Sequence, residues 1–318
     1  MTVARFVLRR LIAACGLFLA VSMLLFAGSE VLPGDAAAAA LGVNATPEQI
    51  EALRAEWGLD RPWTLRWAEW LFAAVQGDLG TSMFSRQPVT ELIAEPFMET
   101  GLLVLLSALV AVPLALVLGT VSGLRPGSRI DRLLSSGSVT LVSIPQFVTA
   151  SILALVFSTM LGLLPAVAMP PIGGRVWDRP EALVLPVAAL SAFAVAWAAR
   201  LVRSTVIDAN SLPSVEAARL AGLPESVVLR RHLLPAIVPP CAHAFAWLIS
   251  GLLGGTAVVE QVFSYPGLSG VLVGAVQHHD TPVLEGVGLL LAGVIILALA
   301  AADVIALLAT PRLRTAAV

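Results

Sequence analysis

The sequence predicts an all-α integral membrane protein with six transmembrane helices. Its 318 residues are 58% hydrophobic and only 13% charged, and the mean hydropathy is +0.91. The apolar residues gather in runs of 20 residues or more, and about 20 apolar residues span a bilayer as one helix. Short polar or Pro/Gly-rich segments separate these runs. This composition excludes an ordinary soluble domain.

The arginine-only basic composition limits the chemistry that the chain can perform. All 19 basic residues are arginine, so the lysine of a phosphate-binding G-x-x-x-x-G-K-[ST] loop has no candidate. The net charge of −2 gives no reason to expect a nucleic-acid partner. Cys15 and Cys241 lie in apolar stretches far apart, which favours core residues over a redox pair or metal site. Because no catalytic motif is visible either, we expect neither an enzyme nor a bound cofactor or metal.

The first expected region, residues 1–32, is an N-terminal tail followed by a transmembrane helix. Arg5, Arg9 and Arg10 precede an apolar run over residues 11–32. A basic start before an apolar stretch also describes a secretory signal peptide. The length of the run and the further spans behind it favour a membrane helix with a cytoplasmic N-terminus.

The second expected region, residues 33–98, is polar enough to form a helical insertion outside the membrane. Thr46 and Gln49 have the spacing of a capping box, and Pro47 suits the first helical position. Gly58 is placed to end this helix.

A further helix of this insertion is predicted from about Pro62 to Gly77. Aromatic and small apolar residues recur along one side of it: Trp63, Trp67, Trp70, Leu71 and Ala74. Such a stripe lies either at the membrane interface or against neighbouring helices. Packing is favoured, because Leu71 and Ala74 share the tryptophan face.

The third expected region, residues 99–318, is a core of five more membrane helices. They are expected at residues 99–123, 133–164, 181–206, 236–263 and 283–308. Pro113 is tolerable inside a span when neighbouring groups satisfy the freed carbonyl. Pro145 is predicted to kink the third span, either opening space for a solute path or fitting the helix into its bundle. Gly251, Gly254 and Gly255 predict close helix packing in the fifth span.

The distribution of arginine predicts the orientation of the chain. Thirteen arginines fall in the N-terminal tail, the loop 125–132, the stretch 200–231 and the C-terminal tail, and six fall in the alternate connections. Cytoplasmic segments carry the excess of positive charge in membrane proteins. We therefore expect both termini and the connection between spans four and five in the cytoplasm.

That connection, residues 211–235, is called the elbow segment below. Its sequence SLPSVEAARLAGLPESVVLRRHLLP predicts two short helices joined by a glycine turn. Ser214 is placed to cap the first helix, with Glu216 in its first turn. Gly222 suits a left-handed position, and Pro224 suits the first turn of the second helix. An ordinary helical hairpin between two spans is the alternative interpretation.

The elbow segment resembles a signature of the permease subunits of ABC importers. Glu216-Ala217-Ala218, Gly222 and Leu234-Pro235 resemble their pattern EAA-x3-G-x9-I-x-LP. His232 stands at the isoleucine position, and Arg231-His232 is similar to the form found in the dipeptide, oligopeptide and nickel branch. The loop GSRIDRLL and the segment LGVNATPEQIEALRAEWGLDRPW, with GDLGTS after it, also resemble this branch. The resemblance covers nearly the whole chain.

In that family the elbow segment is the coupling helix, which docks into a groove of an ATPase. The resemblance implies eight coupling residues: Glu216, Ala217, Ala218, Gly222, Leu223, Pro224, His232 and Pro235. It implies a type I importer in the bacterial inner membrane, with a second, homologous permease as heterodimer partner. Two cytoplasmic ATPase subunits would bind ATP and Mg, and an extracytoplasmic protein would bind the solute.

Di- or oligopeptides are the expected solutes, and nickel or another small solute carried by the same machinery is the alternative. An autonomous secondary transporter or channel is an alternative from another class. Such proteins commonly show internal repeats and charges near the membrane midplane. Neither feature is evident in this sequence, and no polar cluster marks a solute site.

Three further positions attract a functional interpretation. His278-His279-Asp280 contains metal-ligand types, but adjacent histidines rarely bind one ion together, so a plain loop is favoured. Asp303 lies inside the last span, where an acid is costly and is usually paired. It matches an aspartate of the family, and pairing with an arginine is favoured over solute contact. Glu260 also matches the family and is expected near the outer mouth, with its role left open.

Overall fold

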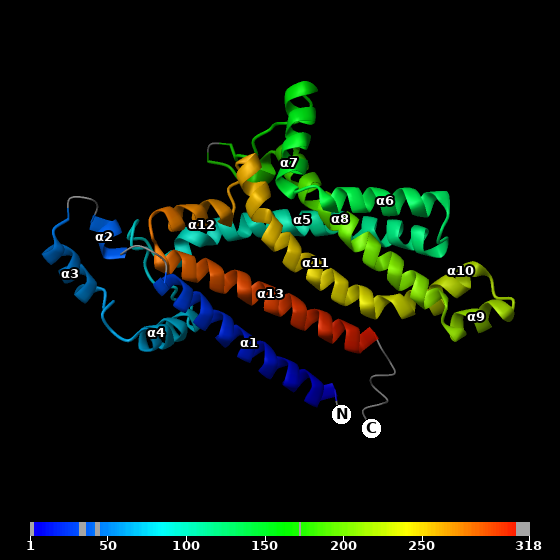
Figure 1. Cartoon of the computed structure of the whole chain (residues 1–318), viewed down its shortest axis with the longest axis horizontal. Helices are drawn as coiled ribbons and strands as arrows, with labels where there is room; N and C mark the ends of the chain where they lie inside the picture. Colours follow the sequence, from blue (N-terminus) through cyan, green and yellow to red (C-terminus); the bar gives the residue numbers. More distant parts are fainter. Residues whose placement is uncertain (1–2, 32–35, 42–44, 172, 310–318) are drawn as a thin grey trace. The chain divides into compact units, whose positions relative to one another are not determined.

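The computed structural model describes residues 3–31, 36–41, 45–171 and 173–309, and these are almost entirely helical (Figure 1). The elements in chain order are α1 (Val3–Val31), α2 (Ala36–Leu41), α3 (Pro47–Glu56), α4 (Trp63–Val75), α5 (Val89–Leu124), α6 (Arg129–Ser143), α7 (Gln146–Ala154), the π-helix η1 (Leu155–Met160), the 3-10 helix η2 (Val176–Asp178), α8 (Pro180–Asn210), α9 (Pro213–Leu220), α10 (Glu225–Val228), the π-helix η3 (Leu229–Leu233), α11 (Leu234–Phe263), α12 (Leu268–Gln277) and α13 (Thr281–Ala309). The segment TPRLR, residues 310–314, whose arginines were counted for the orientation of the chain, lies outside the described residues.

The predicted all-α membrane fold is confirmed. Within the described ranges, α1, α5, α8, the run from α10 through α11, and α13 are long and apolar enough to cross a bilayer. The pair formed by α6 and α7 with η1 makes a sixth span when it is counted as one broken helix. These segments correspond in order to the six predicted spans.

The predicted kink at Pro145 is a complete break. The axes of α6 and of α7 with η1 differ by 98°. Ile144 has extended backbone angles, and Pro145 stands at the N-cap of α7 with ψ of 139°. Proline disfavours helical geometry in the residue before it and has no N–H for the helical ladder. The single helix predicted over residues 133–164 is therefore two helices, and the second ends at Met160.

The chain divides into two compact units, and the first comprises residues Gly101–Tyr265 with the chain ends up to Ile12 and from Leu297. In this unit α8 packs against α6, α7 and α11. The elements α9 and α10 connect α8 to α11 at the end of these helices away from α7 (Figure 1).

Two glycines allow α5 to cross α8 closely. A Cβ atom on Gly119 would lie 2.6 Å from Cβ of Val202, and one on Gly123 would lie 2.7 Å from Cβ of Val206. Small residues permit such an approach of two helix backbones. Of the three glycines predicted to permit close packing in the fifth span, Gly255 does so, because a Cβ atom there would lie 2.7 Å from Oε1 of Gln146. At Gly251 and Gly254 a Cβ atom would meet nothing within 4 Å among the described residues, so the prediction is wrong for these two.

An ion pair joins the beginning of α6 to α8. Ser128 caps α6, and the buried carboxylate of Asp131 accepts hydrogen bonds from Arg203 Nε at 2.5 Å and Nη2 at 2.9 Å. The N–H of Gly127 donates to the same carboxylate at 2.8 Å. Paired, hydrogen-bonded charges of this kind are the form in which buried ions are tolerated.

The second unit comprises Ala13–Thr100 and Pro266–Ile296. Its buried core draws on α4, the connection after it, α5, α12 and α13: Leu71, Leu79, Val89, Ile93, Leu268, Ala275, Val283, Val287 and Leu289. Trp67, Trp70 and Ala74 pack against this core, so the interpretation of the tryptophan stripe as a packing surface is confirmed. Trp63 is the exception, since it remains 37% exposed.

The helix signals predicted in this unit are confirmed. Thr46 and Gln49 form both hydrogen bonds of the capping box, and Pro47 begins α3. Gly58 and Gly77 follow their helices with φ of +65° and +91°. These positive angles are the conformations that glycine adopts without strain.

Two elements of this unit were not foreseen. The connection between the fifth and sixth predicted spans contains α12, whose Leu268 N–H donates to the buried hydroxyl of Thr100 at 2.9 Å. Helix α5 begins at Val89, ten residues before the predicted span. Val89 and Ile93 are buried one turn apart, so packing against the unit core extends the helix beyond its apolar stretch.

The approach of α5 to α8 predicts that Gly119→Ala destabilises the protein. The added methyl group would force Val202 or the Ala199 carbonyl to move, and overpacking of this kind costs about 1–3 kcal/mol. We expect a lower midpoint of thermal unfolding in detergent. Gly101→Ala, in the same helix but in open space, is the matched control, because alanine there only gains helix propensity. Equal midpoints for the two variants would contradict the close-crossing argument.

Candidate functional site

The first helix of the elbow segment, α9, begins two residues earlier than a cap at Ser214 would give. Its N-cap is Leu212, and Pro213 takes the first helical position. The prediction that Ser214 caps this helix is therefore wrong, because proline at 213 fixes a helical φ before the serine is reached. Glu216 lies in the first turn as predicted.

The glycine turn is confirmed. Gly222 has φ of +78°, and the N–H groups of Gly222 and Leu223 donate to the carbonyls of Arg219 and Ala218 at 2.9 and 3.2 Å. A left-handed residue after a helix commonly closes it with such bonds. A Cβ atom on Gly222 would meet nothing within 4 Å. Glycine is therefore required at position 222 because of the backbone conformation, and not because a side chain would lack space.

The second helix of the elbow segment is not a separate short helix. Pro224 stands at the N-cap of α10 rather than in its first turn, and α10 continues through the π-helix η3 into α11. Pro235 has no N–H to donate, so the regular hydrogen-bond ladder is interrupted just behind η3. His232 lies in η3 and is half-buried, whereas Pro235 is exposed.

A buried apolar core attaches the elbow segment to the two long helices beside it. Its members come from the end of α8, from α9, α10 and η3, and from the start of α11: Val202, Val206, Ala209, Val215, Ala218, Val228, Leu233, Ile237 and Cys241. Val215 and Ala218 are therefore the inner face of α9. Side chains in such a core have little freedom to shift independently.

The other face of α9 is exposed and largely apolar at its tip. Glu216, Ala217 and Ala221 are exposed, Leu220 is 84% exposed, and Leu223 also faces outward. An exposed leucine beside small residues is a surface that another protein can cover.

Arg219 holds the two halves of the elbow segment together. Its Nη2 donates to Glu225 Oε1 at 2.6 Å and to Asn210 Oδ1 at 2.8 Å, and its Nε donates to Glu225 Oε2 at 3.2 Å. The hydrogen bonds to Glu225 raise the pKa of Arg219 despite partial burial. Among the described residues, the acid that pairs with Arg219 is therefore Glu225, at the start of α10, and not Glu216 on α9.

The two acidic residues singled out near the last spans lie in buried positions. Asp303 forms an ion pair with Nε of Arg10, which is the structural pairing favoured from the sequence. Glu260 is almost completely buried, and the Tyr265 N–H donates to its backbone carbonyl at 2.8 Å.

The segment His278-His279-Asp280 has a structural role. Asp280 is buried and accepts hydrogen bonds from the Ser82 hydroxyl and from the N–H groups of Met83 and Phe84. The ring of His278 stacks on Phe84 with centroids 3.8 Å apart. The described residues contain no group of three or more potential metal ligands.

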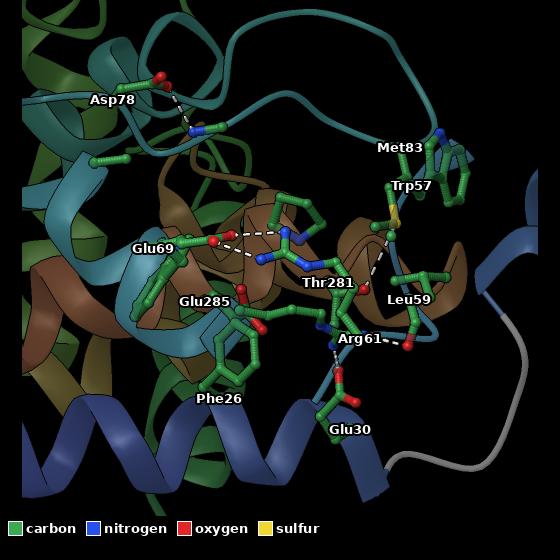
Figure 2. A pocket seen from close by; sticks show the side chains of 16 residues that line it. Phe26, Glu30, Trp57, Leu59, Arg61, Glu69, Asp78, Met83, Thr281 and Glu285 are labelled. Atoms are coloured by element: carbon green, nitrogen blue, oxygen red, sulfur yellow. Dashed lines mark hydrogen bonds and ion pairs between the residues drawn. The ribbon is translucent and has the colours of Figure 1, made fainter. Parts of the chain in front are cut away.

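A mixed-charge pocket of about 360 Å³ lies in the second unit, between α1, α4, the start of α13 and the adjoining loops (Figure 2). Arg61 donates two hydrogen bonds to Glu69, at 2.9 and 2.5 Å. These bonds lower the pKa of Glu69 and raise that of Arg61. Arg66 pairs with Glu30, and partial burial lowers the pKa of its guanidinium group. The pocket combines charged groups with aromatic walls.

A second cavity, of about 400 Å³, lies in the first unit between α7, α8 and α11. Gln146, the first residue after the Pro145 break, lines it together with Trp197 and Trp247, the latter 63% exposed. The carboxamide of Gln146 also lies against Gly255. Sequence reasoning missed these residues because tryptophans in apolar helices are common and only the fold brings them to one cavity.

The chain matches two family models that together cover nearly all of it. Residues 111–315 match the model described as the inner membrane component of binding-protein-dependent transport systems. Residues 3–103 match the model for the N-terminal part of the membrane component of these systems.

Similar proteins match over most of their length. A protein of Brucella abortus, named provisionally a peptide transport system permease protein, is 32% identical over 97% of this chain and 98% of its own length. The glutathione transport system permease protein GsiC of Escherichia coli O6:H1 is 35% identical over 88% of this chain and 89% of its own. GsiC of Salmonella paratyphi A is 34% identical over 97% and 98%. The chain therefore belongs to the family of inner-membrane permease components of binding-protein-dependent ABC importers.

Proposed function

We propose that this chain is the permease subunit of an ABC importer for peptides. As a member of its family it is a multi-pass inner-membrane translocation subunit and not an enzyme. Relatives of nearly full-length similarity are named peptide or glutathione transport permeases, and this is the observation that supports a peptide solute. Glutathione is itself a tripeptide, so both names fall in one chemical class.

The elbow segment is the proposed contact with a cytoplasmic ATPase. Two features support this role. Its outer face presents Leu220 beside Ala217 and Ala221, a slim apolar surface suited to a groove. Its inner face is fixed to α8 and α11 by a shared core. Movement imposed on the elbow segment would therefore be passed to two membrane helices rather than absorbed by a loop.

The remaining machinery belongs to other chains. We propose two ATPase subunits that bind ATP and Mg, a homologous permease as heterodimer partner, and an extracytoplasmic solute-binding protein. Both termini and the elbow segment lie in the cytoplasm in this arrangement, in agreement with the excess of arginine there. Closure of the ATPases would bias the permease between two helix packings.

The cavity beside Gln146 is the proposed stretch of the solute path in this subunit. Non-helical backbone at membrane depth is tolerated where it is buried in protein or lines a water-filled cavity. The break at Ile144 and Pro145 meets this condition, because the next residue lines the cavity. This favours the interpretation that Pro145 opens space for a solute.

Purification of the tagged chain from its native membranes in mild detergent tests the proposed function. We expect a second six-span permease and a chain with a phosphate-binding G-x-x-x-x-G-K-[ST] loop in the eluate. The complex in proteoliposomes, with its binding protein, should take up dipeptides only when ATP is present. Uptake driven by an ion gradient by the chain alone would instead identify an autonomous transporter.

Gly222→Val is predicted to abolish coupling while membrane insertion stays normal. A β-branched residue is strained at φ of +78°, where the added atoms have space but the backbone conformation is disfavoured. The matched variant Gly222→Asn should retain most uptake, because asparagine tolerates left-handed angles. The measurement is ATP-dependent dipeptide uptake at equal amounts of assembled complex. Wild-type uptake in Gly222→Val would refute the role of the turn.

Reversal of the Arg219–Glu225 pair tests whether the elbow segment acts as one rigid body. Arg219→Glu places two carboxylates together and should reduce uptake at an unchanged amount of protein. Combining it with Glu225→Arg restores opposite charges and should recover a substantial part of the activity. Asp208→Asn, at an exposed position near the end of α8 and outside the eight coupling residues, controls for loss of charge. If uptake does not recover in the double variant, the Arg219–Glu225 pair does not hold the elbow segment together as one rigid body.

A further inference from the structure

The mixed-charge pocket carries more negative charge than its own arginines balance. Its lining holds four carboxylates and two guanidinium groups: Glu30, Glu69, Asp78, Glu285, Arg61 and Arg66. Both guanidinium groups are engaged, that of Arg61 by two hydrogen bonds to Glu69 and that of Arg66 by Glu30 and by the Leu59 carbonyl at 2.9 Å. Asp78 and Glu285 have no salt bridge within the described residues.

Glu285 is the unusual member of this set. It lies in the first turns of α13 and is only 6% exposed. The Ser29 hydroxyl donates to its Oε1 at 2.5 Å, and the described part of the chain offers no donor to its Oε2. Figure 2 shows this carboxylate among the side chains that line the pocket. A buried carboxylate is costly unless a cation or several donors compensate it. The charge of Arg66 also acts on Glu285, without a salt bridge between them. The fold therefore holds a buried acid beside an open cavity, with one hydrogen-bond donor and a guanidinium group that already pairs with Glu30.

Asp78 extends the negative charge to the exposed rim. Its Oδ1 accepts the Gly80 N–H at 2.9 Å, which orients the carboxylate within the turn after α4. Because Asp78 is exposed, salt and water screen it more than they screen Glu285. The pocket lining therefore includes one exposed acid, Asp78, and one buried acid, Glu285.

The walls select an organic cation over a metal ion. Trp57, Trp70 and Phe26 line the same cavity, and aromatic faces attract ammonium and guanidinium groups. The guanidinium group of Arg66 lies 5.6 Å from the Phe26 ring centroid, so this wall already accommodates a cation. The described residues include no group of three or more potential metal ligands, and one buried carboxylate with aromatic walls suits a monovalent head group.

We propose that this pocket binds the ammonium group of a transported peptide, with Glu285 as the buried anion and Asp78 as the anion at the rim. The volume of about 360 Å³ lies in the range of small-molecule sites. The identity of the solute rests on the proposed function, whereas the ammonium site itself rests on the pocket. The two are separable by experiment.

The test uses the permease complex in nanodiscs and saturation-transfer NMR, which detects weak ligands. The probes are ethylammonium, dialanine, and N-acetyl-dialanine, which lacks the ammonium charge. We expect ethylammonium and dialanine to bind and the acetylated peptide to bind at least tenfold more weakly. Glu285→Gln should weaken both cations about tenfold, and Asp78→Asn about threefold. Glu51→Gln, an exposed position on α3 outside the pocket, should change nothing.

Because Glu285 is buried, Glu285→Gln is first compared with the wild type by thermal unfolding. If Glu285→Gln unfolds at a lower temperature than the wild type, the ammonium site is tested with Asp78→Asn alone, because Asp78 is exposed. Equal binding of dialanine and its acetylated form, or unchanged binding in Asp78→Asn, would overturn the ammonium site. Ethylammonium binding without ATP-dependent dipeptide uptake would instead retain the site and reject peptides as the solute.

Discussion

The apolar core shared by the elbow segment and the ends of α8 and α11 is the constraint on which the proposed mechanism depends. Val215 and Ala218 on α9 reach Val206 and Ile237 because the chain reverses at Gly222. Burial of this face leaves the opposite face, with Leu220, for a partner. The same contacts that fold the segment therefore decide which of its residues a partner can touch, and they attach it to both neighbouring helices.

Charge in this protein is arranged in two ways. Two buried carboxylates are paired with arginines, Asp131 with Arg203 and Asp303 with Arg10, and a third, Asp280, accepts hydrogen bonds from the Ser82 hydroxyl and two backbone N–H groups. Such pairs limit the cost of charge in an apolar surrounding. The mixed-charge pocket differs from these cases, because the buried carboxylate of Glu285 borders an open cavity and has one hydrogen-bond donor, Ser29, and no salt bridge within the described residues. That contrast is the reason to assign a ligand to the pocket rather than a packing role.

Local signals in the sequence were reliable where one short stretch contains the whole cause. The capping box of Thr46 and Gln49, the positive φ of Gly222 and the break at Pro145 depend on residues adjacent in the chain. The cap at Ser214 failed because Pro213, one residue earlier, already begins the helix. The partner of an ion pair could not be predicted from the sequence, for a different reason. The sequence contains several acids that could pair with Arg219, and only the folded turn brings Glu225 to it.

The sequence by itself determined the membrane class, the order of the apolar segments, the family resemblance and the helix–glycine–helix form of the elbow segment. These follow from apolar run lengths and backbone preferences, which are properties of neighbouring residues. Tertiary structure decided that α12 is a helix, that Gly119 rather than Gly251 permits close packing, and that Glu285 faces a pocket. Each of these depends on atoms from distant parts of the chain meeting in space, and a hydropathy pattern carries no information about which helices become neighbours.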